Sequence, residues 1–284
     1  MTTVSDHAEI VGEFRYPRNT AADAKGSIHD DATASRLGFR GGTVAGSLHM
    51  DQFVPVLIAL FGNRWLERGN LSLYFRQATV DREMVRCFGA RVEDSLRARV
   101  RMENEAGDLI SEGGASCIGA DPDTELSRRV KAQIPSSALK ILGRCAVGDR
   151  VADIPAKVSD EVLQRRLETI VEPLPCYRGA GPWSGKVLPP SMATHLMTGV
   201  QNTLLPMAAP AVGLYGAIEL QFLAGPLFAE TDYTLDGEIL ALSESPKTEN
   251  VWYRTVVRAK PGGPDLAWMI MYLRFLKASS PLWS

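Results

Sequence analysis

A carboxylate and an imidazole lie close together near the start of the chain, in the stretch DAKGSIHDD. Asp23 and His29 are six residues apart. Together they can hold one water molecule, with one group accepting a proton and the other returning it. Asp30 and Asp31 follow directly and suit a different role, as the N-cap and first-turn acid of a short helix, DATASRL. The pattern predicts an Asp23/His29 acid–base pair, while a plain turn aspartate and an exposed loop histidine remain the alternatives.

A second group of candidate residues lies in GTVAGSLHMDQFVPVLIALF (42–61), a glycine-bearing loop that runs into an almost uniformly apolar segment. Gly46 and Ser47 come at its start, where the unpaired N–H groups of a first helical turn can stabilise charge on a carbonyl oxygen. Glycine also lets a ligand approach the backbone closely. His49 and Asp51 follow, and burial of an unpaired acid is costly. We expect Gly46, Ser47, His49 and Asp51 to contribute to oxyanion or substrate binding, with simple packing or backbone roles as the alternative.

Composition restricts the classes of function. The chain has 284 residues, 45% of them hydrophobic and 23% charged, and a net charge of −2. These values are typical of a soluble globular protein and give no reason to expect a nucleic acid or an anionic membrane as partner. The first residues, MTTVSDHAEIVGEF, do not form a signal peptide, and no apolar stretch is long enough to span a membrane. We therefore expect a cytoplasmic protein.

Cysteine and histidine spacing does not favour a metal site or disulfides. The four cysteines contain no CxxC pair, and the four histidines contain no HExxH motif. Reduced, buried thiols are the expected state, and no metal is expected. The residues in question are Cys87, Cys117, Cys145, Cys176, His7, His29, His49 and His195.

The order of segments occurs twice along the chain. In each half a glycine- or proline-bearing turn enters an apolar segment, and strand-like alternating segments and a final hairpin follow. The positions that we align are Ser47 with Ser191, Gly69 with Gly216, and Gly107 with Gly263. We predict an N-terminal domain over residues 1–125 and a C-terminal domain over residues 146–284. A polar linker over residues 126–145, with room for a short helix, would join them.

Each apolar segment predicts a helix enclosed by protein, because apolar residues cover every side of it. The strands that follow would form a curved antiparallel sheet around the helix, which is an α+β architecture. Pro55 lies inside the first segment, and an interior proline costs a helix about 3 kcal/mol. We therefore expect the regular helix to start near Asp51 or Gln52, with Pro55 in the first turn, or to kink.

A buried helix held by an antiparallel sheet, preceded by a glycine loop and present twice, is similar to the double (tandem) hot-dog fold. The stretch SIHDDATASRLGFRGGTVAGS resembles the MaoC-like family, which includes the (R)-specific enoyl-CoA hydratases. Those enzymes carry D-x-N-P-x-H, a short acidic helix and G-[FY]-x-G before the hot-dog helix. RLGFRGGTVAG (36–46) follows the later part of this pattern, and LPPSM (188–192) resembles the corresponding turn of the second half. The plan covers most of the chain, whereas the motif covers only about residues 23–50.

The chain departs from the family motif in its catalytic part. Asp23 and His29 are six residues apart where the motif has five, and DAKGSIH lacks the Asn-Pro pair. In the second half, VEPLPCYRGAGPWSG contains neither aspartate nor histidine. The resemblance therefore implies that any hydratase chemistry belongs to the first half, with the second half shaping the acyl or CoA groove.

Three functions stay open at this point. The resemblance implies a hydratase or dehydratase acting on an acyl thioester such as an enoyl-CoA, with Asp23 and His29 as the acid–base pair and no cofactor. The second is a hot-dog thioesterase, or a repurposed hot-dog enzyme on a bulky or cyclic substrate; some thioesterases of this fold place their carboxylate on the hot-dog helix, where Asp51 lies. The third is a non-catalytic acyl-binding subunit. The expected partner is an acyl-CoA or a related thioester, and a further homodimer is open.

Overall fold

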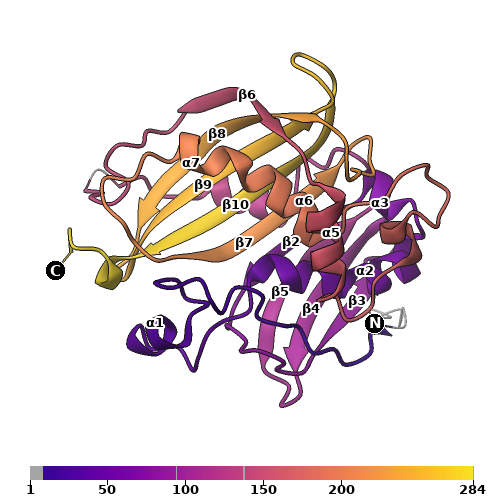
Figure 1. Cartoon of the computed structure of the whole chain (residues 1–284), viewed down its shortest axis with the longest axis horizontal. Coiled ribbons are helices and arrows are strands. Elements are labelled where there is room, and N and C mark those ends of the chain that lie inside the picture. Colours follow the sequence, from indigo (N-terminus) through magenta and orange to yellow (C-terminus); the bar gives the residue numbers. More distant parts are fainter. Residues whose placement is uncertain (1–8, 94, 137, 284) are drawn as a thin grey trace, which may run out of the picture.

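One antiparallel sheet of ten strands runs through the whole molecule (Figure 1). The structure, a computed structural model, describes residues 9–93, 95–136 and 138–283. The strands follow the spatial order β1-β3-β4-β5-β2-β7-β10-β9-β8-β6. Their bounds are β1 Ile10–Val11, β2 Asn70–Phe75, β3 Val85–Arg91, β4 Arg97–Asn104, β5 Leu109–Ser116, β6 Arg150–Ala156, β7 Gly213–Phe222, β8 Tyr233–Glu244, β9 Thr248–Arg258 and β10 Asp265–Leu276.

Alternating residues explain why these segments form strands with one buried face. In β4, Ala98, Val100 and Met102 are buried, and the residues between them are more exposed. The tight turn after β4 leads into β5, as the hairpin pattern around Gly107 predicts, and Gly107 adopts a positive φ of 86°. The same arrangement joins β9 to β10 around the KPGGPD turn.

The sheet consists of two five-stranded halves that are related by a pseudo-twofold axis. The central strands β2 and β7 pair with each other, with Ser72 opposite Glu219. Outward from them the two halves repeat in order, β5-β4-β3-β1 on one side and β10-β9-β8-β6 on the other. This is the arrangement of a double hot-dog fold, with the two sheets joined edge to edge.

Matching hydrogen bonds give the equivalent positions in the two halves. Two successive amides after β2 donate to one carbonyl of β5, and two after β7 do the same to β10. The bonds are Arg76 and Gln77 N–H to Ile110 O (2.8 and 3.3 Å), and Leu223 and Ala224 N–H to Leu266 O (2.9 and 3.0 Å). The difference in residue number between Arg76 and Leu223 equals that between Gly69 and Gly216, and the difference between Ile110 and Leu266 equals that between Gly107 and Gly263. The structure therefore aligns these glycines as the sequence predicted.

The first hot-dog helix, α2 (Gly46–Phe61), is buried along most of its length. It begins at Gly46, so our expectation of a regular start near Asp51 or Gln52 is wrong, and Pro55 lies in the helix interior. Proline has no N–H, so the carbonyl of Asp51 lacks its usual helical donor. The apolar residues around the helix, among them Phe53 and Leu57, belong to the main core and offset this local cost.

The second apolar segment forms a shorter and broken helix. It consists of α6 (Pro190–Met197), the 3₁₀ turn η2 (Thr198–Val200) and α7 (Gln201–Leu204). Together they lie across the strands of the second half (Figure 1). The helix α6 packs against α2, so the two hot-dog helices contact each other near the pseudo-twofold axis.

Shorter helices complete the fold. They are α1 (Asp31–Arg36), α3 (Trp65–Arg68), α4 (Glu125–Lys131), α5 (Asp160–Leu167) and the 3₁₀ turns η1 (Pro175–Arg178) and η3 (Lys277–Ser279). The helix α4 lies at the start of the predicted linker and packs Leu126 against Ala217 and Trp252 on the outer face of the sheet. Among the described residues, no helix combines the length and apolar character that crossing a membrane requires.

Candidate functional site

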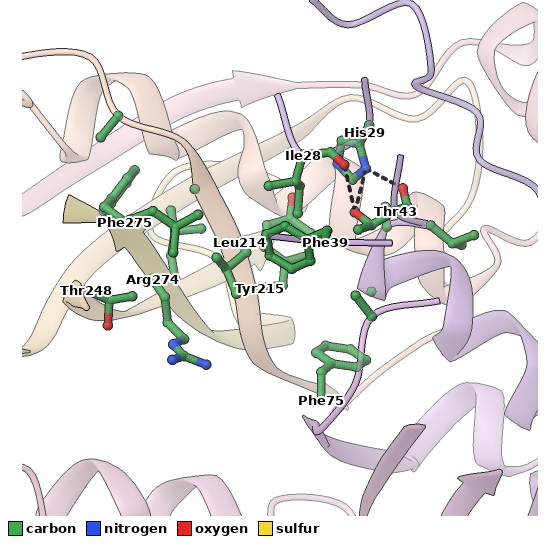
Figure 2. A pocket seen from close by; sticks show the side chains of 18 of the residues that line it. Ile28, His29, Phe39, Thr43, Phe75, Leu214, Tyr215, Thr248, Arg274 and Phe275 are labelled. Atoms are coloured by element: carbon green, nitrogen blue, oxygen red, sulfur yellow. Dashed lines mark hydrogen bonds between the residues drawn. The ribbon is translucent and has the colours of Figure 1, made fainter. Parts of the chain in front are cut away.

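A cavity of about 530 Å³ lies at the amino end of α2, and residues of both halves line it (Figure 2). The first half contributes the loop before α2, including His29 and Gly46, and the end of β2. The second half contributes the beginning of β7 and the end of β10, with apolar side chains such as Leu214 and Phe275. This position agrees with the expectation that the second half shapes the groove for a site in the first half.

The loop holds the His29 ring in one orientation. The Nδ1 of His29 lies 2.7 Å from the carbonyl oxygen of Thr43. A carbonyl only accepts, so Nδ1 carries a proton and donates it, and in the neutral form of the ring the lone pair then lies on Nε2. The Asn19 side-chain amide donates to the His29 carbonyl (2.7 Å) and fixes the backbone at this point. His29 therefore has the tautomer that a general base requires.

The residues around Gly42 connect the short helix α1 to this loop. The Asp31 carboxylate accepts from the N–H of Gly42 (2.6 Å), and Thr43 N–H donates to the carbonyl of Ile28 (2.9 Å). A Cβ atom at Gly42 would lie 2.3 Å from the His29 carbonyl oxygen, so only glycine fits there. Asp31 is thus in the first turn of α1, as predicted, and also holds the neighbouring loop.

Asp30 occupies the predicted N-cap position of α1, although its carboxylate makes no capping bond to the helix backbone. Instead, it accepts from the hydroxyl of Thr33 (2.8 Å). This hydrogen bond is the main cause that lowers the Asp30 pKa from its ordinary value.

The amino end of α2 is open toward the cavity. Its N-cap, Ala45, provides no side-chain hydrogen bond, and its first turn contains no acid. The first N–H groups of a helix lack helical partners, so they are available to a carbonyl or enolate oxygen. Gly46 lines the cavity, and Ser47 is the next residue of the helix without lining it. A Cβ at Gly46 would lie 2.7 Å from the Phe75 ring, so glycine here allows Phe75 to form part of the wall.

His49 lines the same cavity from the first turns of α2 and is only 2% exposed. Its Nε2 lies 2.8 Å from the Thr79 hydroxyl, and its Nδ1 is buried without a hydrogen-bond partner in the described structure. Burial lowers the pKa of His49 to about 4, against a smaller opposing effect of the Glu83 charge. The His49 imidazole is therefore neutral near pH 7.

Asp23 does not take part in this arrangement. Its side chain is exposed in the turn before His29, and it is not among the residues that line the cavity. The described lining contains no aspartate or glutamate, although it contains two histidines, two arginines and a lysine. The structure therefore does not bring Asp23 and His29 together in the cavity, and a catalytic role for Asp23 has no geometric support.

Asp51 also lies outside the cavity. It is 5% exposed, and its Oδ1 accepts from the backbone N–H of Ser191 (2.8 Å) in the first turn of α6. Burial raises the pKa of Asp51 to about 6, and the hydrogen bond from the Ser191 backbone N–H partly opposes this rise. The Asp51 carboxylate thus lies at the amino end of α6. The amino end of α2, which is the equivalent position in the first half, faces the cavity instead.

The region around Asp51 is the pseudo-symmetric counterpart of the His29 site. Val187 N–H donates to the Cys176 carbonyl (3.0 Å), as Thr43 N–H does to Ile28, so Tyr177 takes the place of His29. The side-chain hydroxyls of Tyr177 and Ser191 are buried without a partner in the described structure. The second half therefore retains the frame of the site without a histidine or an open helix end.

The helix α3 closes the opening of this second site. Gly225 N–H donates to the Glu67 carbonyl (2.9 Å), and Phe222 N–H donates to the Gly69 carbonyl (2.8 Å). Trp65 packs edge-on against Phe222, with ring centroids 5.8 Å apart. The equivalent place in the first half is open, because β2 and β7 pair only as far as Tyr74 and Ala217.

The sequence analysis named His29, Gly46 and His49, which line this cavity, but it did not name several other residues that line the cavity or hold His29. Asn19 and Thr43 hold His29, yet neither lies in a recognisable motif. Arg274 and Tyr215 reach the cavity only through the pairing of the two halves, which no local pattern indicates. The signal that marked the loop around Gly42 was the stretch GFRGG, which resembles the G-[FY]-x-G motif of the MaoC-like family.

Several solved structures are similar to this chain over nearly its whole length. A MaoC domain dehydratase from Chloroflexus aurantiacus has 12% identity and a TM-score of 0.62, with 95% of each chain covered. A conserved hypothetical protein of Mycobacterium tuberculosis with a double hotdog fold has 13% identity and a TM-score of 0.60, covering 96% of this chain and 97% of the other. The dehydratase domain of PpsC from Mycobacterium tuberculosis, in complex with C12:1-CoA, has 12% identity and a TM-score of 0.51, with 97% of both chains covered.

These likenesses define the class of fold. The chain has the double hot-dog fold found in MaoC-like dehydratases. No protein-family model matches the sequence, and no curated protein matches it.

Proposed function

We propose that this protein is a hydratase or dehydratase that acts on an acyl thioester, with His29 as its acid–base group. One observation carries the proposal: the His29 ring, held by the Thr43 carbonyl at 2.7 Å, lines the same cavity as the open amino end of α2. A base beside a set of unpaired N–H donors suits addition of water to an α,β-unsaturated thioester. The likeness to dehydratases, one of them in complex with an acyl-CoA, supports the choice of substrate class.

The reaction can proceed with a single imidazole. Nε2 of His29 accepts a proton from water as the water oxygen bonds to the β-carbon, and the π electrons move toward the thioester oxygen. The Gly46 N–H, at the end of α2 that faces the cavity, stabilises that oxygen. The imidazolium then returns its proton to the α-carbon, so all atoms of water are added. Dehydration is the reverse of these steps.

His49 has a supporting role in this proposal. Because its pKa is about 4, it stays neutral at physiological pH and does not compete with His29 for protons. Its Nε2 lies 2.8 Å from the Thr79 hydroxyl, and its buried Nδ1 has no hydrogen-bond partner in the described structure. The proposed acid–base group is thus His29 alone, and Asp23 has no part in it.

The test uses crotonyl-CoA with the purified protein. Hydration removes the absorbance of the enoyl thioester, whereas thioester hydrolysis releases a free thiol. We expect the first signal, and we expect His29→Ala to lower kcat by about 10²- to 10⁴-fold. His195→Ala, on the exposed side of α6, is the matched control and leaves the rate unchanged.

Two further results separate the alternatives. Asp23→Asn should keep full activity, and its inactivation would restore the Asp23/His29 pair that the motif implies. Thiol release in place of hydration would favour a thioesterase, and binding without either reaction would favour an acyl-binding subunit. Full activity of His29→Ala would contradict the proposal.

A further inference from the structure

An opening leads into the cavity where the two central strands separate. The strands β2 and β7 pair from Asn70 and Gln221 to Tyr74 and Ala217. Beyond that point the end of β2 stays with β5, and the beginning of β7 stays with β10. Residues from both separated ends line the cavity, among them Phe75 and Tyr215. The first half thus keeps open the place that α3 fills in the second.

Arg274, on β10, lies beside this opening and has no counter-charge among the residues that the structure describes. It lines the cavity and is half-buried, and its Nε is buried without a hydrogen-bond partner. Arg274 forms no ion pair with any residue that the structure describes. In Figure 2 its guanidinium extends beyond the apolar side chains of Leu214 and Phe275.

The arginine on the other side of the opening differs. The Arg76 Nε donates to the Glu112 carboxylate (2.7 Å), and its guanidinium stacks over the Tyr74 ring, 4.7 Å from the centroid. Its charge is therefore balanced within the protein. Of the two arginines in the described lining, Arg274 is the one without an ion pair to a described residue, so its charge is available to a ligand.

Gly216 provides the room for Arg274. A Cβ there would lie 2.9 Å from the Arg274 Cδ and 2.4 Å from the Tyr272 ring. A larger residue would displace the stem of the arginine. Partial burial of a charged group without a partner costs free energy, and a ligand that supplies the opposite charge removes the cost.

We propose that Arg274 binds an anionic oxygen group, a carboxylate or a phosphate, of the thioester that occupies this cavity. Guanidinium matches both groups through paired N–H donors. The anion comes either from the far end of the acyl chain, as in the monothioester of a dicarboxylic acid, or from the phosphates of CoA. This inference rests on the proposed acyl-thioester ligand and does not depend on which reaction follows.

The experiment measures equilibrium binding by calorimetry, so it does not require turnover. Four saturated ligands separate the two sources of charge: valeryl-CoA, glutaryl-CoA, valeryl-pantetheine and glutaryl-pantetheine. The proteins are the wild type, Arg274→Gln, Arg274→Lys and the matched control Arg99→Gln. Arg99 is an exposed arginine on β4 that does not line this cavity, so its loss changes the net charge equally.

We expect Arg274→Gln to weaken binding by about 10- to 100-fold for the ligands that carry the relevant anion. If the phosphates supply it, both CoA thioesters lose affinity and both pantetheine thioesters do not. If the acyl carboxylate supplies it, both glutaryl ligands lose affinity and both valeryl ligands do not. Arg274→Lys should restore part of the affinity, and Arg99→Gln should resemble the wild type.

Three results would overturn the inference. The first is that Arg274→Gln binds all four ligands like the wild type. The second is that it weakens valeryl-pantetheine, which carries no anion, as much as the others. The third is that the wild type binds none of the four. A protein that shows the expected pattern but no hydration would keep the role of Arg274 and reject the proposed hydratase activity.

Discussion

The carboxylate of Asp51, in the middle of α2, accepts a hydrogen bond from the backbone N–H of Ser191, in the first turn of α6, over 2.8 Å. One hot-dog helix thus supplies an internal anion to the amino end of the other. The amino end of α2 receives no such group, because Ala45 cannot cap it and its first turn has no acid. This asymmetry distinguishes the amino end of α2, which faces the cavity, from the amino end of α6, where the Asp51 carboxylate lies.

The buried carboxylate predicts how stability depends on pH. The pKa of Asp51 is about 6 in the folded protein, against an ordinary value of 3.8. The folded state therefore binds more protons than the unfolded state between these values, and stability falls as the pH rises through this window. The rise of about two pKa units corresponds to a loss of about 3 kcal/mol at most.

Asp51→Asn removes this ionisation and keeps an oxygen that accepts from Ser191. We expect the free energy of unfolding of the variant, relative to that of the wild type, to increase by up to about 3 kcal/mol between pH 4 and pH 8. Urea denaturation across this range measures the difference. Asp23→Asn, at an exposed position, is the control and should follow the wild type. Parallel stability curves for Asp51→Asn and the wild type would contradict the raised pKa.

His49 predicts a pH dependence of the opposite sign. Its folded-state pKa is about 4, below the ordinary value of 6.5, so the unfolded state binds more protons between these values. Stability from this group is present above pH 6.5 and is lost as the pH falls toward 4, by about 3 kcal/mol.

The variant His49→Gln tests that sign, since glutamine does not titrate and can still reach the Thr79 hydroxyl. Compared with the wild type, it should lose less stability on acidification from pH 7 to pH 4.5. The same denaturation series reports it. A steeper acid loss in the variant than in the wild type would show that His49 is charged in the folded protein.

The fold was largely predictable because its signals are local. Alternation marked β4 and β5, and the turn glycines aligned Gly107 with Gly263. The continuous apolar character of each helix predicted a helix enclosed by protein. The break of the second helix into α6, η2 and α7 was not predicted, because it depends on how that segment fits the strands beneath it.

The site was predictable only where it follows the chain. His29 and Gly46 come from one loop and one helix start, so a motif can mark both. Whether the Asp23 carboxylate enters the cavity depends on the turn from Ala21 to Ala24, whose hydrogen bond (2.9 Å) leaves no trace in the pattern of residue types. Arg274 enters through the pairing of β2 with β7, which brings together residues about 150 positions apart in the chain, such as Asn70 and Gln221.

The contact between Gly46 and Phe75 allows a test of how the open helix end is built. A Cβ at residue 46 would lie 2.7 Å from the Phe75 ring, closer than real contacts allow. Gly46→Ala should therefore push the ring toward the cavity and lower stability by about 1–3 kcal/mol, as overpacking does. The same displacement should lower the affinity for acyl thioesters.

A double-mutant cycle separates this contact from a general helix effect. In a Phe75→Leu background the ring is absent, so Gly46→Ala should cost clearly less than in the wild type, with a coupling of about 1 kcal/mol or more. Gly114→Ala is the matched control, because a Cβ there meets only the Ala98 carbonyl at 3.7 Å, an ordinary contact. Equal costs of Gly46→Ala in both backgrounds would mean that the helix end tolerates a side chain and that the ring does not limit access to its N–H groups.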